Sequence, residues 1–417
     1  MSPDRVFEPL RPCLLSAHYP PRSTEGIARH TELVARGLAE LGHEVHVVTL
    51  GDQPSVVRQD GAWIHSVPFE PPERYQQLRF AGCQELWYWL RWSHAAWLEI
   101  RALIDEHGVQ IVDSPLWNLD GFVTQIAGRV PVVVRIATAM RQISRIHGRV
   151  DPERELIGEL EQRFLERADG WIPNSQASVD SLRYVYGLEL DRRLQPVVPH
   201  GMIPVDETEV AEREADGQVR VLFVGRLETR KGIGDLLEAI PEVLRRHPNV
   251  RFQLAGADNS TEDGYRAREG GSYEAIFRRR HPQHSARVEF LGWVPEETLE
   301  RLYRECDLFV GPSLYESFGL IYTEAMNRGR PVIACNTGGA AEIVVDGETG
   351  RLVPPGKAAA LGEAICALVS DPAGRRRMGS AGRRRFLERY THVAMARSFA
   401  ESYRRVLERR GASGGGA

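Results

Sequence analysis

Residues 219–256 read VRVLFVGRLETRKGIGDLLEAIPEVLRRHPNVRFQLAG, and this stretch decides the fold class. The apolar run 219–224 predicts a strand buried on both faces, as the strands of parallel sheets are. Helical periodicity then covers residues 235–246, and residues 251–256 supply a second strand. A strand, a helix and a second strand in this order predict a parallel βαβ unit, the repeating element of α/β domains.

The same alternation extends in both directions along the chain. Apolar runs predict further strands of this half at 288–292, 308–313 and 331–335. The first third repeats the βαβ order, with a strand, a helix and a strand at 13–16, 27–41 and 44–50. We therefore expect an α/β fold of two Rossmann-like, doubly wound domains facing across a cleft, with ligands at the carboxyl ends of the strands.

The predicted domain boundaries follow from local composition. Residues 202–218 are acidic and contain few hydrophobic side chains, so they predict a linker between domains at 1–201 and 219–392. An amphipathic helix over 393–410 is expected to pack across the domain boundary. The glycine-rich tail, 411–417, is expected to be disordered.

The overall composition excludes several classes of protein. The chain has 417 residues, 42% of them hydrophobic and 26% charged, which is typical of a folded enzyme. A net charge of −4 disfavours general nucleic-acid binding. The five cysteines show no metal-ligand spacing, and the amino terminus lacks the pattern of a secretory signal, so we expect a cytoplasmic protein with free thiols.

Aromatic side chains crowd one predicted helix in the first domain, at Trp87, Tyr88, Trp89, Trp92 and Trp97. Such a face could contact a membrane peripherally or a lipid acceptor. Packing against the sheet or a neighbouring subunit is favoured, because aromatic side chains dominate cores and interfaces.

Two glutamates bracket a predicted strand-to-helix turn at 312–324, PSLYESFGLIYTE. Glu316 is expected in the loop and Glu324 about two turns along the helix, so both carboxylates can face one polyhydroxylated ligand. The backbone N–H groups of Phe318, Gly319 and Leu320 lie where the helix dipole favours an anion such as diphosphate. A capped helix with two solvated glutamates is the alternative, but it leaves the apolar residues between them unexplained.

A second group of charges follows the strand 219–224, in the sequence VGRLETRKG. Arg226 and Lys231 leave a strand end in a glycine-flanked turn, where two cations can bind a diphosphate through charge-assisted hydrogen bonds. Preorganised cations also stabilise the negative charge that develops on a departing nucleotide diphosphate. Taken alone, these side chains could equally be solvated.

Together these motifs resemble the retaining family 4 glycosyltransferases of the GT-B fold. The resemblance covers nearly the whole chain and is most specific in the second half. It is carried by TEGIARHTELVARGLAELGHEVHVVT, IPNSQASVDSL, VVPHG, VGRLETRKG, VEFLGWVPEETLERLY and ESFGLIYTEAMNRGRPVIACNTGGAAEIVVDGETGRLVPPG.

The resemblance implies roles for residues in the second domain, which would bind a nucleotide-sugar donor. Glu316 would contact hydroxyls of the transferred sugar, and Glu324 would hold the ribose. Arg226 and Lys231 would bind the diphosphate. Backbone groups would complete the donor site at Phe318, Gly319, Leu320, Gly292 and Val294.

The resemblance further implies that the first domain binds the acceptor, a small molecule, lipid or glycan, and that a loop at Gly26 closes on the phosphates. Metal ions and cofactors are not expected, because cations and amides take their place. The family mechanism is drawn as front-face substitution, in which the β-phosphate accepts the proton of the acceptor hydroxyl. No enzymatic base is then required, although Glu316 as a nucleophile stays open.

Two positions depart from the family pattern. Glu25 stands where many relatives carry a glycine, and Ala137 stands where many carry a histidine. Thr138, Arg141 or a water could substitute for that histidine. His200 is expected to be a hinge, an acceptor contact or an ordinary loop residue.

Other functions remain as alternatives at this point. A catalytically weak nucleotide-sugar-binding protein is suggested by the two departures, and a same-fold epimerase or phosphorylase shares the architecture. A dehydrogenase is disfavoured, because neither half has G-x-G-x-x-G after its first strand. The histidines at 18, 30, 43 and 46 show no metal-ligand spacing, so no metal site is predicted.

Overall fold

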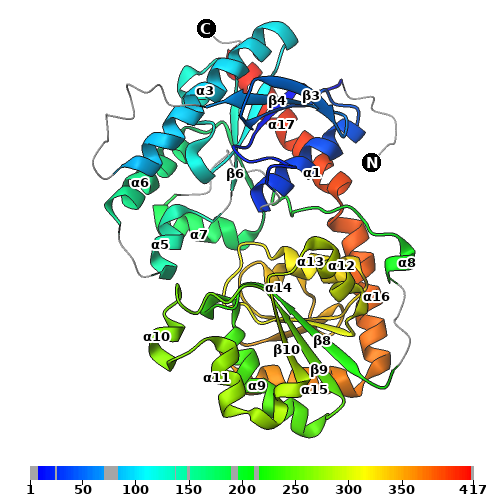
Figure 1. Ribbon diagram of the computed structural model, residues 1–417. Helices are drawn as coiled ribbons and strands as arrows, with labels where there is room; N and C mark the ends of the chain where they lie inside the picture. Colours follow the sequence, from blue (N-terminus) through cyan, green and yellow to red (C-terminus); the bar gives the residue numbers. More distant parts are fainter. Residues whose placement is uncertain are drawn as a thin grey trace. The chain divides into compact units, whose positions relative to one another are not determined.

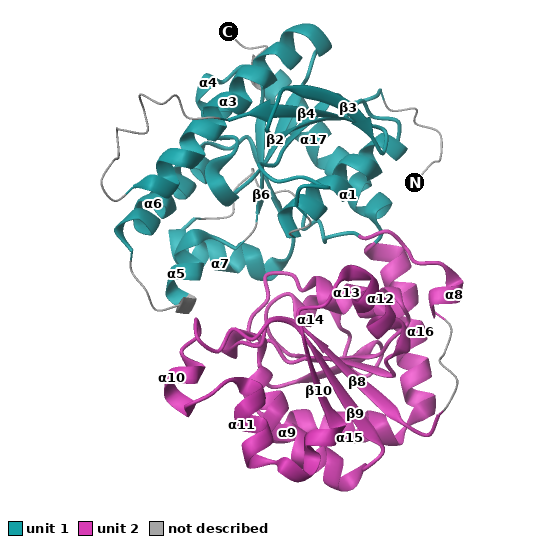
Figure 2. Ribbon diagram, viewed as in Figure 1, with its two compact units in different colours: residues 1–201, 391–417 teal, residues 202–390 magenta. Residues whose placement is uncertain are grey.

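The computed structural model describes residues 8–23, 26–69, 83–136, 138–147, 151–188, 196–210 and 216–414. The chain forms two compact units, one of residues 1–201 with 391–417 and the other of residues 202–390 (Figure 2). The expected linker at 202–218 is thus grouped with the second unit, and the carboxyl-terminal segment returns to the first.

A seven-stranded sheet forms the centre of the first unit, in the order β3-β4-β2-β1-β5-β6-β7 (Figure 1). Every strand pair is parallel except β3 with β4. That pair is a hairpin, whose turn residues Asp60 and Gly61 both have positive φ, as a two-residue turn requires. The strands are β1 (Pro12–Leu15), β2 (His46–Gly51), β3 (Ser55–Gln59), β4 (Ala62–Pro68), β5 (Ile111–Pro115), β6 (Val132–Ile136) and β7 (Gly170–Pro173).

Helices cover this sheet. They are α1 (Gly26–Glu40), α3 (Gln84–His107), α4 (Phe122–Ala127), α5 (Met140–His147), α6 (Pro152–Arg167), α7 (Gln176–Tyr186) and α17 (His392–Gly414), with the short η1 (Trp117–Leu119).

The last helix, α17, packs inside the first unit. Phe399, Tyr403 and Val406 are buried in one cluster with residues of α1 and the sheet. A Cβ on Gly37 of α1 would lie 2.7 Å from that of Ala396, so the two helices are in close contact. After residue 390 the chain passes from the second unit to the first, and this helix packs on the first sheet. Of the tail expected to be disordered, residues 411–414 are helical, because α17 continues through them, and residues 415–417 lie outside the described residues.

The aromatic segment of α3 mainly packs inward. Trp92 is fully buried and donates a 3.0 Å hydrogen bond to Asp120. Trp89 and Trp97 pack half-buried against the same core, whereas Tyr88 is exposed. This arrangement agrees with the packing interpretation of the sequence. Among the helices that the structure describes, none is long and apolar enough to cross a bilayer.

The second unit is a doubly wound domain with six parallel strands in the order β10-β9-β8-β11-β12-β13. Numbered within the unit, this is the 3-2-1-4-5-6 order of a Rossmann fold, whose switch point lies between β8 and β11. The strands are β8 (Val219–Val224), β9 (Val250–Ala255), β10 (Val288–Gly292), β11 (Leu308–Gly311), β12 (Val332–Cys335) and β13 (Gly350–Val353). The sequence reading identified the first five, and β13 adds a sixth.

The helices of this unit include several single turns. They are α8 (Glu207–Val210), η2 (Thr229–Lys231), α9 (Ile233–Arg246), α10 (Tyr265–Glu269), α11 (Tyr273–Arg280), η3 (Pro282–Arg287), α12 (Glu296–Glu305), α13 (Leu320–Asn327), α14 (Ala340–Ile343), α15 (Ala358–Ser370) and α16 (Pro372–Arg389).

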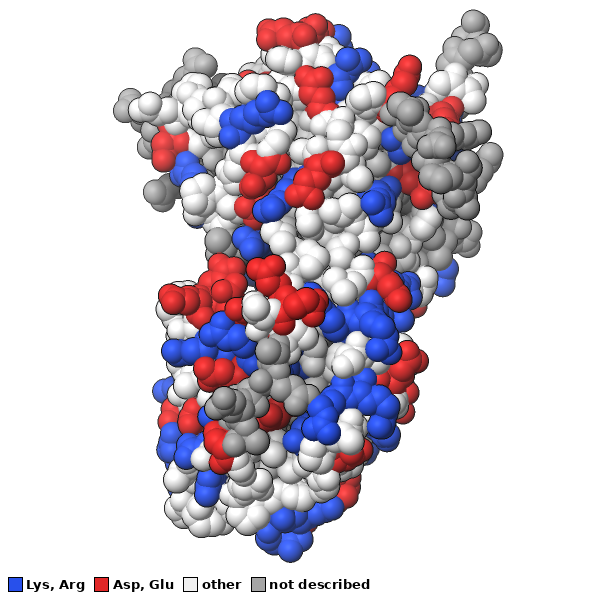
Figure 3. All heavy atoms as spheres, turned by 90° about the vertical axis from the view of Figure 1, so that its right-hand side faces the viewer, with Lys and Arg blue, Asp and Glu red and all other residues white. Residues whose placement is uncertain are grey.

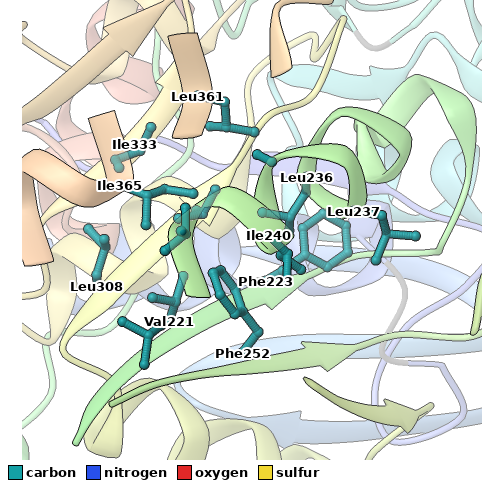
Figure 4. Packing of buried hydrophobic residues seen from close by; sticks show 14 of the residues in the cluster. Val221, Phe223, Leu236, Leu237, Ile240, Phe252, Leu308, Ile333, Leu361 and Ile365 are labelled. Atoms are coloured by element: carbon teal, nitrogen blue, oxygen red, sulfur yellow. The ribbon is translucent and has the colours of Figure 1, made fainter. Parts of the chain in front are cut away.

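Figure 4 shows how α9 packs on the sheet of the second unit. Leu236 and Ile240 lie one turn apart on the helix and face Phe223 of β8 and Phe252 of β9. All four side chains are buried, and each contributes about 1.5–3 kcal/mol of transfer free energy. This packing fixes β8 and the start of α9, and therefore the loop between them.

Charged side chains of both signs lie on the face drawn in Figure 3, where Lys and Arg gather in groups with Asp and Glu beside them. The mixture accords with the small net charge of the chain.

Candidate donor site in the second unit

The candidate site lies at the switch point of the second sheet. β8 and β11 are hydrogen-bonded neighbours, with Leu308 paired to Val221. Because both strands are parallel, the segments 225–232 and 312–319 leave the sheet at the same edge. The connections after these two strands continue on opposite faces of such a sheet, which creates the ligand-binding crevice of doubly wound folds.

Close backbone contact joins these two segments. Gly232 has φ of 69°, and a Cβ there would overlap the carbonyl oxygen of Pro312. The N–H of Leu314 also donates a 2.8 Å hydrogen bond to the carbonyl of Arg230. Glycine is thus required at position 232 both by its backbone conformation and by the lack of space.

Glu316 lies among cationic side chains of these segments. Its Oε1 pairs with Nζ of Lys231 and accepts a 2.9 Å hydrogen bond from the hydroxyl of Ser313. Nη1 of Arg230 lies 3.5 Å from its Oε2. Only 9% of Glu316 is exposed, so Lys231 and Glu316, two separately predicted site residues, form a partly desolvated ion pair.

Glu228 contacts both arginines of the segment 225–232 through its carboxylate. Its buried carboxylate accepts hydrogen bonds from Arg230 at 2.8 Å and Asn259 at 3.1 Å. Arg226 lies 3.5 Å from the same carboxylate, but 57% of its side chain is exposed. Its guanidinium is therefore accessible to an anion in solution.

The loop that carries Glu316 packs against the backbone of two adjacent glycines, Gly338 and Gly339. The N–H of Gly339 donates a 2.9 Å hydrogen bond to the carbonyl of Glu316. A Cβ on Gly338 would overlap that carbonyl, and a Cβ on Gly339 would lie 2.6 Å from Cα of Phe318. The adjacent Gly-Gly sequence lets this backbone support the loop at close range.

The N-terminus of α13 follows directly. Gly319 has φ of 101° and lies against the ring of Tyr322. Leu320 is the first helical residue, and the first N–H groups of a helix have no carbonyl partner within it. These amides form the kind of helix terminus that binds phosphate. Phe318 itself is buried against Tyr390, so its ring supports the loop.

Glu324 lies on α13 and is bound by Tyr303 of α12, whose hydroxyl donates a 2.6 Å hydrogen bond to Oε2. Burial raises the pKa of Glu324, and the Tyr303 hydrogen bond opposes this effect. Oε1 is the oxygen left to a ligand.

The segment after β10 presents both backbone and aromatic groups. Gly292 has φ of 62°, and its carbonyl accepts a 2.7 Å hydrogen bond from the N–H of Gly256. Val294 packs half-buried on the core, whereas the indole of Trp293 is 76% exposed. The carbonyl of Gly292 thus already accepts one hydrogen bond, and the side chain of Trp293 is largely exposed.

The remaining predicted residues belong to the first unit. Gly26 is exposed and begins α1. Thr138 is half-buried just before α5. Glu25 and Ala137, the two departures from the family pattern, lie outside the described residues.

Arg141 has structural partners within the first unit. Its Nη2 pairs with Glu155 at 2.7 Å, its Nη1 donates to Gln162 at 3.0 Å, and its guanidinium lies over the ring of Tyr186. These contacts join α5 to α6 and α7.

His200 lies beside Asn174, whose Nδ2 is 3.0 Å from Nε2 of the imidazole. The ring of His30 makes an edge contact with it at 4.1 Å between centroids. Burial, reinforced by the charge of Arg135, lowers the pKa of His200 to about 4. The imidazole is therefore neutral near pH 7.

Sequence reasoning missed Ser313, Arg230, Glu228 and Tyr303. Arg230 and Glu228 lie inside the VGRLETRKG motif, so their charges and their place in that motif could have identified them as candidate site residues. Tyr303 contacts Glu324 from another helix, which no local pattern indicates.

Two family models match this chain. The model of the family Glycosyltransferase Family 4 matches residues 24–202, and that of Glycosyl transferases group 1 matches residues 205–385. This chain belongs to the group 1 and family 4 glycosyltransferases. A glycogen synthase of Mycobacterium tuberculosis is 26% identical, over 94% of this chain and 94% of its own.

Solved structures confirm the GT-B fold of this glycosyltransferase. Sucrose-phosphate synthase from Thermosynechococcus elongatus superposes with a TM-score of 0.72 at 24% identity, over 96% of this chain and 99% of that one. Anabaena HepE, solved in complex with UDP and glucose, superposes with a TM-score of 0.67 at 20% identity, over 94% and 99%.

Proposed function

We propose that this glycosyltransferase is a retaining, metal-independent enzyme that transfers a sugar from a nucleotide-diphosphate donor to an acceptor hydroxyl. The observation that carries the proposal is the cluster of Lys231, Arg230 and Glu316 at the switch point of the second sheet. The solved complex of HepE with UDP and glucose supports a nucleotide sugar of this kind as the donor.

The cations at the switch point suit a diphosphate leaving group. Lys231 and Arg226 supply positive charge from one segment, and the first amides of α13 supply it from the other. As the bond from the sugar to the β-phosphate breaks, negative charge grows on the phosphate oxygen. Fixed cations and dipoles stabilise that charge without reorganising, which is the largest catalytic contribution in many enzymes. A metal ion is not needed for this purpose.

Glu316 contacts hydroxyls of the transferred sugar in this proposal. Its second oxygen, Oε2, has a weaker partner than Oε1, because Arg230 lies 3.5 Å away. Lys231 exchanges part of its contact with Glu316 for a donor phosphate when the donor binds. Glu324 holds the ribose through the oxygen that Tyr303 leaves available.

Retention follows from attack on the face that the leaving group vacates. The acceptor oxygen bonds to the anomeric carbon there, and its proton goes to the departing β-phosphate oxygen. Glu324 is bound by Tyr303, and Glu228 is bound by Arg230 and Asn259. Of the carboxylates described at this site, Glu316 is therefore the candidate nucleophile for a double displacement, the alternative route to retention. The acceptor is a small molecule, lipid or glycan, bound by the first unit.

A donor screen tests the proposal. The purified chain is incubated with UDP-, GDP-, ADP- and TDP-sugars, with and without EDTA, and followed by thermal shift and mass spectrometry. One donor should raise the melting temperature and be slowly hydrolysed, equally well in EDTA. Glu316→Ala should abolish hydrolysis, whereas Glu348→Ala, which changes an exposed glutamate, should not.

Nuclear magnetic resonance of the transferred sugar then reads the stereochemistry, and an inverted anomeric centre would contradict retention. Loss of activity in EDTA would contradict metal independence. Binding without any turnover would indicate the alternative, a nucleotide-sugar-binding protein.

A further inference from the structure

A group of potential metal ligands lies in the first unit, at the edge of the sheet opposite the carboxyl ends of the strands. His46 is the first residue of β2, Glu44 precedes it by two positions, and His107 is the last residue of α3. One ligand atom from each side chain lies within 4.8 Å of the others. Glu44 and His107 are exposed, whereas the side chain of His46 is only 1% exposed.

A hydrogen-bonded chain behind His46 determines which of its nitrogens carries the proton. Nδ1 of His65 lies 3.1 Å from a carboxylate oxygen of Glu99, and a carboxylate only accepts, so this nitrogen carries hydrogen. In a neutral His65 the other nitrogen, Nε2, is then an acceptor. Nδ1 of His46 lies 3.0 Å from it and must donate. Nε2 of His46 is left with an unshared electron pair.

That electron pair has no hydrogen-bond donor in the described part of the chain. Nε2 of His46 is buried without a hydrogen-bond partner there. A carboxylate oxygen of Glu44 lies 3.6 Å away, which places two electron-pair donors beside one another. The ring of His107 lies 5.0 Å from that of His46, measured between centroids. A buried acceptor of this kind is unfavourable unless a hydrogen-bond donor or a cation binds it.

We propose that Glu44, His46 and His107 bind a divalent transition-metal cation of the zinc class. Two imidazoles and a carboxylate are typical zinc ligands, with a water in the fourth position. The relay through His65 to Glu99 matches the outer shell that orients metal-binding histidines in other proteins.

The geometry accommodates such a cation with small movements. Bonds of about 2.0–2.1 Å in a tetrahedral site place ligand atoms about 3.3 Å apart, so separations within the cluster must shorten by up to about 1.5 Å. His46 is fixed by its relay, and the exposed side chains of Glu44 and His107 can rotate toward it. The cation would connect the end of α3 to the start of β2 and would stabilise the first unit.

No metal site was predicted from the sequence, and the proposed cation site replaces that prediction. His46 and His107 lie in elements far apart in the chain, so no short sequence motif contains both ligands. The site is also distant in the sheet from the carboxyl ends of the strands, so its role is structural and independent of sugar transfer.

The test uses the full chain, freed of any affinity tag and depleted of metal. Titration calorimetry with zinc chloride should show one cation per chain, and cobalt(II) should develop the visible absorption of a tetrahedral site. His107→Ala and Glu44→Gln should weaken zinc binding at least about tenfold, because each removes a ligand. His94→Ala, an exposed histidine of the same helix, should bind like the unchanged protein.

The variant Glu99→Ala tests the contribution of the hydrogen-bonded relay apart from that of the ligands, because Glu99 does not contact the cation. Removing such an outer-shell partner should weaken binding by about 10–100-fold. Zinc should also raise the melting temperature of the unchanged chain and not that of His107→Ala. Absence of saturable one-to-one binding, or equal binding by His107→Ala, would overturn the proposal.

Discussion

Lys231 and Glu316 form an ion pair that joins the segments after two neighbouring parallel strands, β8 and β11. They lie 85 positions apart in the chain, yet strand order brings their segments to one edge of the sheet. The ion pair therefore fixes the positions of the cationic segment and the carboxylate segment of the candidate donor site before any ligand binds.

Removal of the lysine charge should impair catalysis more than stability. Lys231→Met should lower kcat/KM by about 10²–10³-fold, the range for loss of one preorganised electrostatic contact. Steady-state kinetics with the donor from the screen measures this effect. Lys357→Met alters an exposed lysine in the same unit and should leave kcat/KM unchanged. Equal kinetics of the two variants would remove Lys231 from the site.

Two neighbouring glycines, Gly232 and Gly234, should differ in their effect on stability when each is changed to alanine. Gly232→Ala should destabilise the second unit by about 3 kcal/mol or more, because Ala resists positive φ and its Cβ overlaps the Pro312 carbonyl. Gly234→Ala, two residues later in α9, has open space and should be stabilising by about 0.5–1 kcal/mol. Urea denaturation followed by tryptophan fluorescence compares the free energies of unfolding. A harmless Gly232→Ala would contradict the described contact between the segments.

A buried carboxyl group makes the first unit sensitive to pH. Glu161 is 1% exposed, and burial raises its pKa from the ordinary 4.5 to about 7, against the hydrogen bond from Tyr186 at 2.5 Å. Since the folded-state pKa is the higher one, its contribution to stability is complete below about pH 4.5 and falls as the pH rises to 7. This group alone should make unfolding easier at pH 8 than at pH 5, by about 3 kcal/mol.

Glu161→Gln should reduce that pH dependence, because an amide oxygen can still accept from the N–H of Met140 and the hydroxyl of Tyr186. Urea denaturation at pH 5 and pH 8 checks it. Asp120, with a pKa raised by burial to about 7, should leave a residual slope of the same sign. An unchanged slope in the variant would refute the role of Glu161.

The last helix should depend on one buried hydrogen bond. Tyr403 of α17 donates a 2.6 Å hydrogen bond to Asp113, a buried carboxylate of β5 that also pairs with Arg135. Tyr403→Phe should destabilise the first unit by about 1–3 kcal/mol, because it leaves a buried oxygen of Asp113 with one fewer donor. Tyr184→Phe changes an exposed tyrosine and is the matched control. Thermal and urea denaturation that do not distinguish the variants would show that the hydrogen bond adds nothing.

Much of the fold could be predicted because its signals are local. The strand at 219–224 was predicted with its observed bounds, since a parallel strand buried on both faces is a continuous apolar run. The helix after it was placed two residues late, because η2 and Gly232 precede Ile233 in a way that periodicity does not reveal. The surface on which the final helix packs was not predictable, since an amphipathic pattern shows that a face is buried and not what covers it.

The sequence by itself determined the α/β class, the division into two halves and the identity of Lys231 and Glu316 as candidate donor-site residues. The tertiary structure alone decided that these two side chains pair, that Arg230 joins them, that Tyr303 binds Glu324 and that His107 reaches His46. The reason is physical. Periodicity, glycines and charge act within a few residues of the chain, whereas side-chain partners depend on strand order and helix packing, which bring distant segments together.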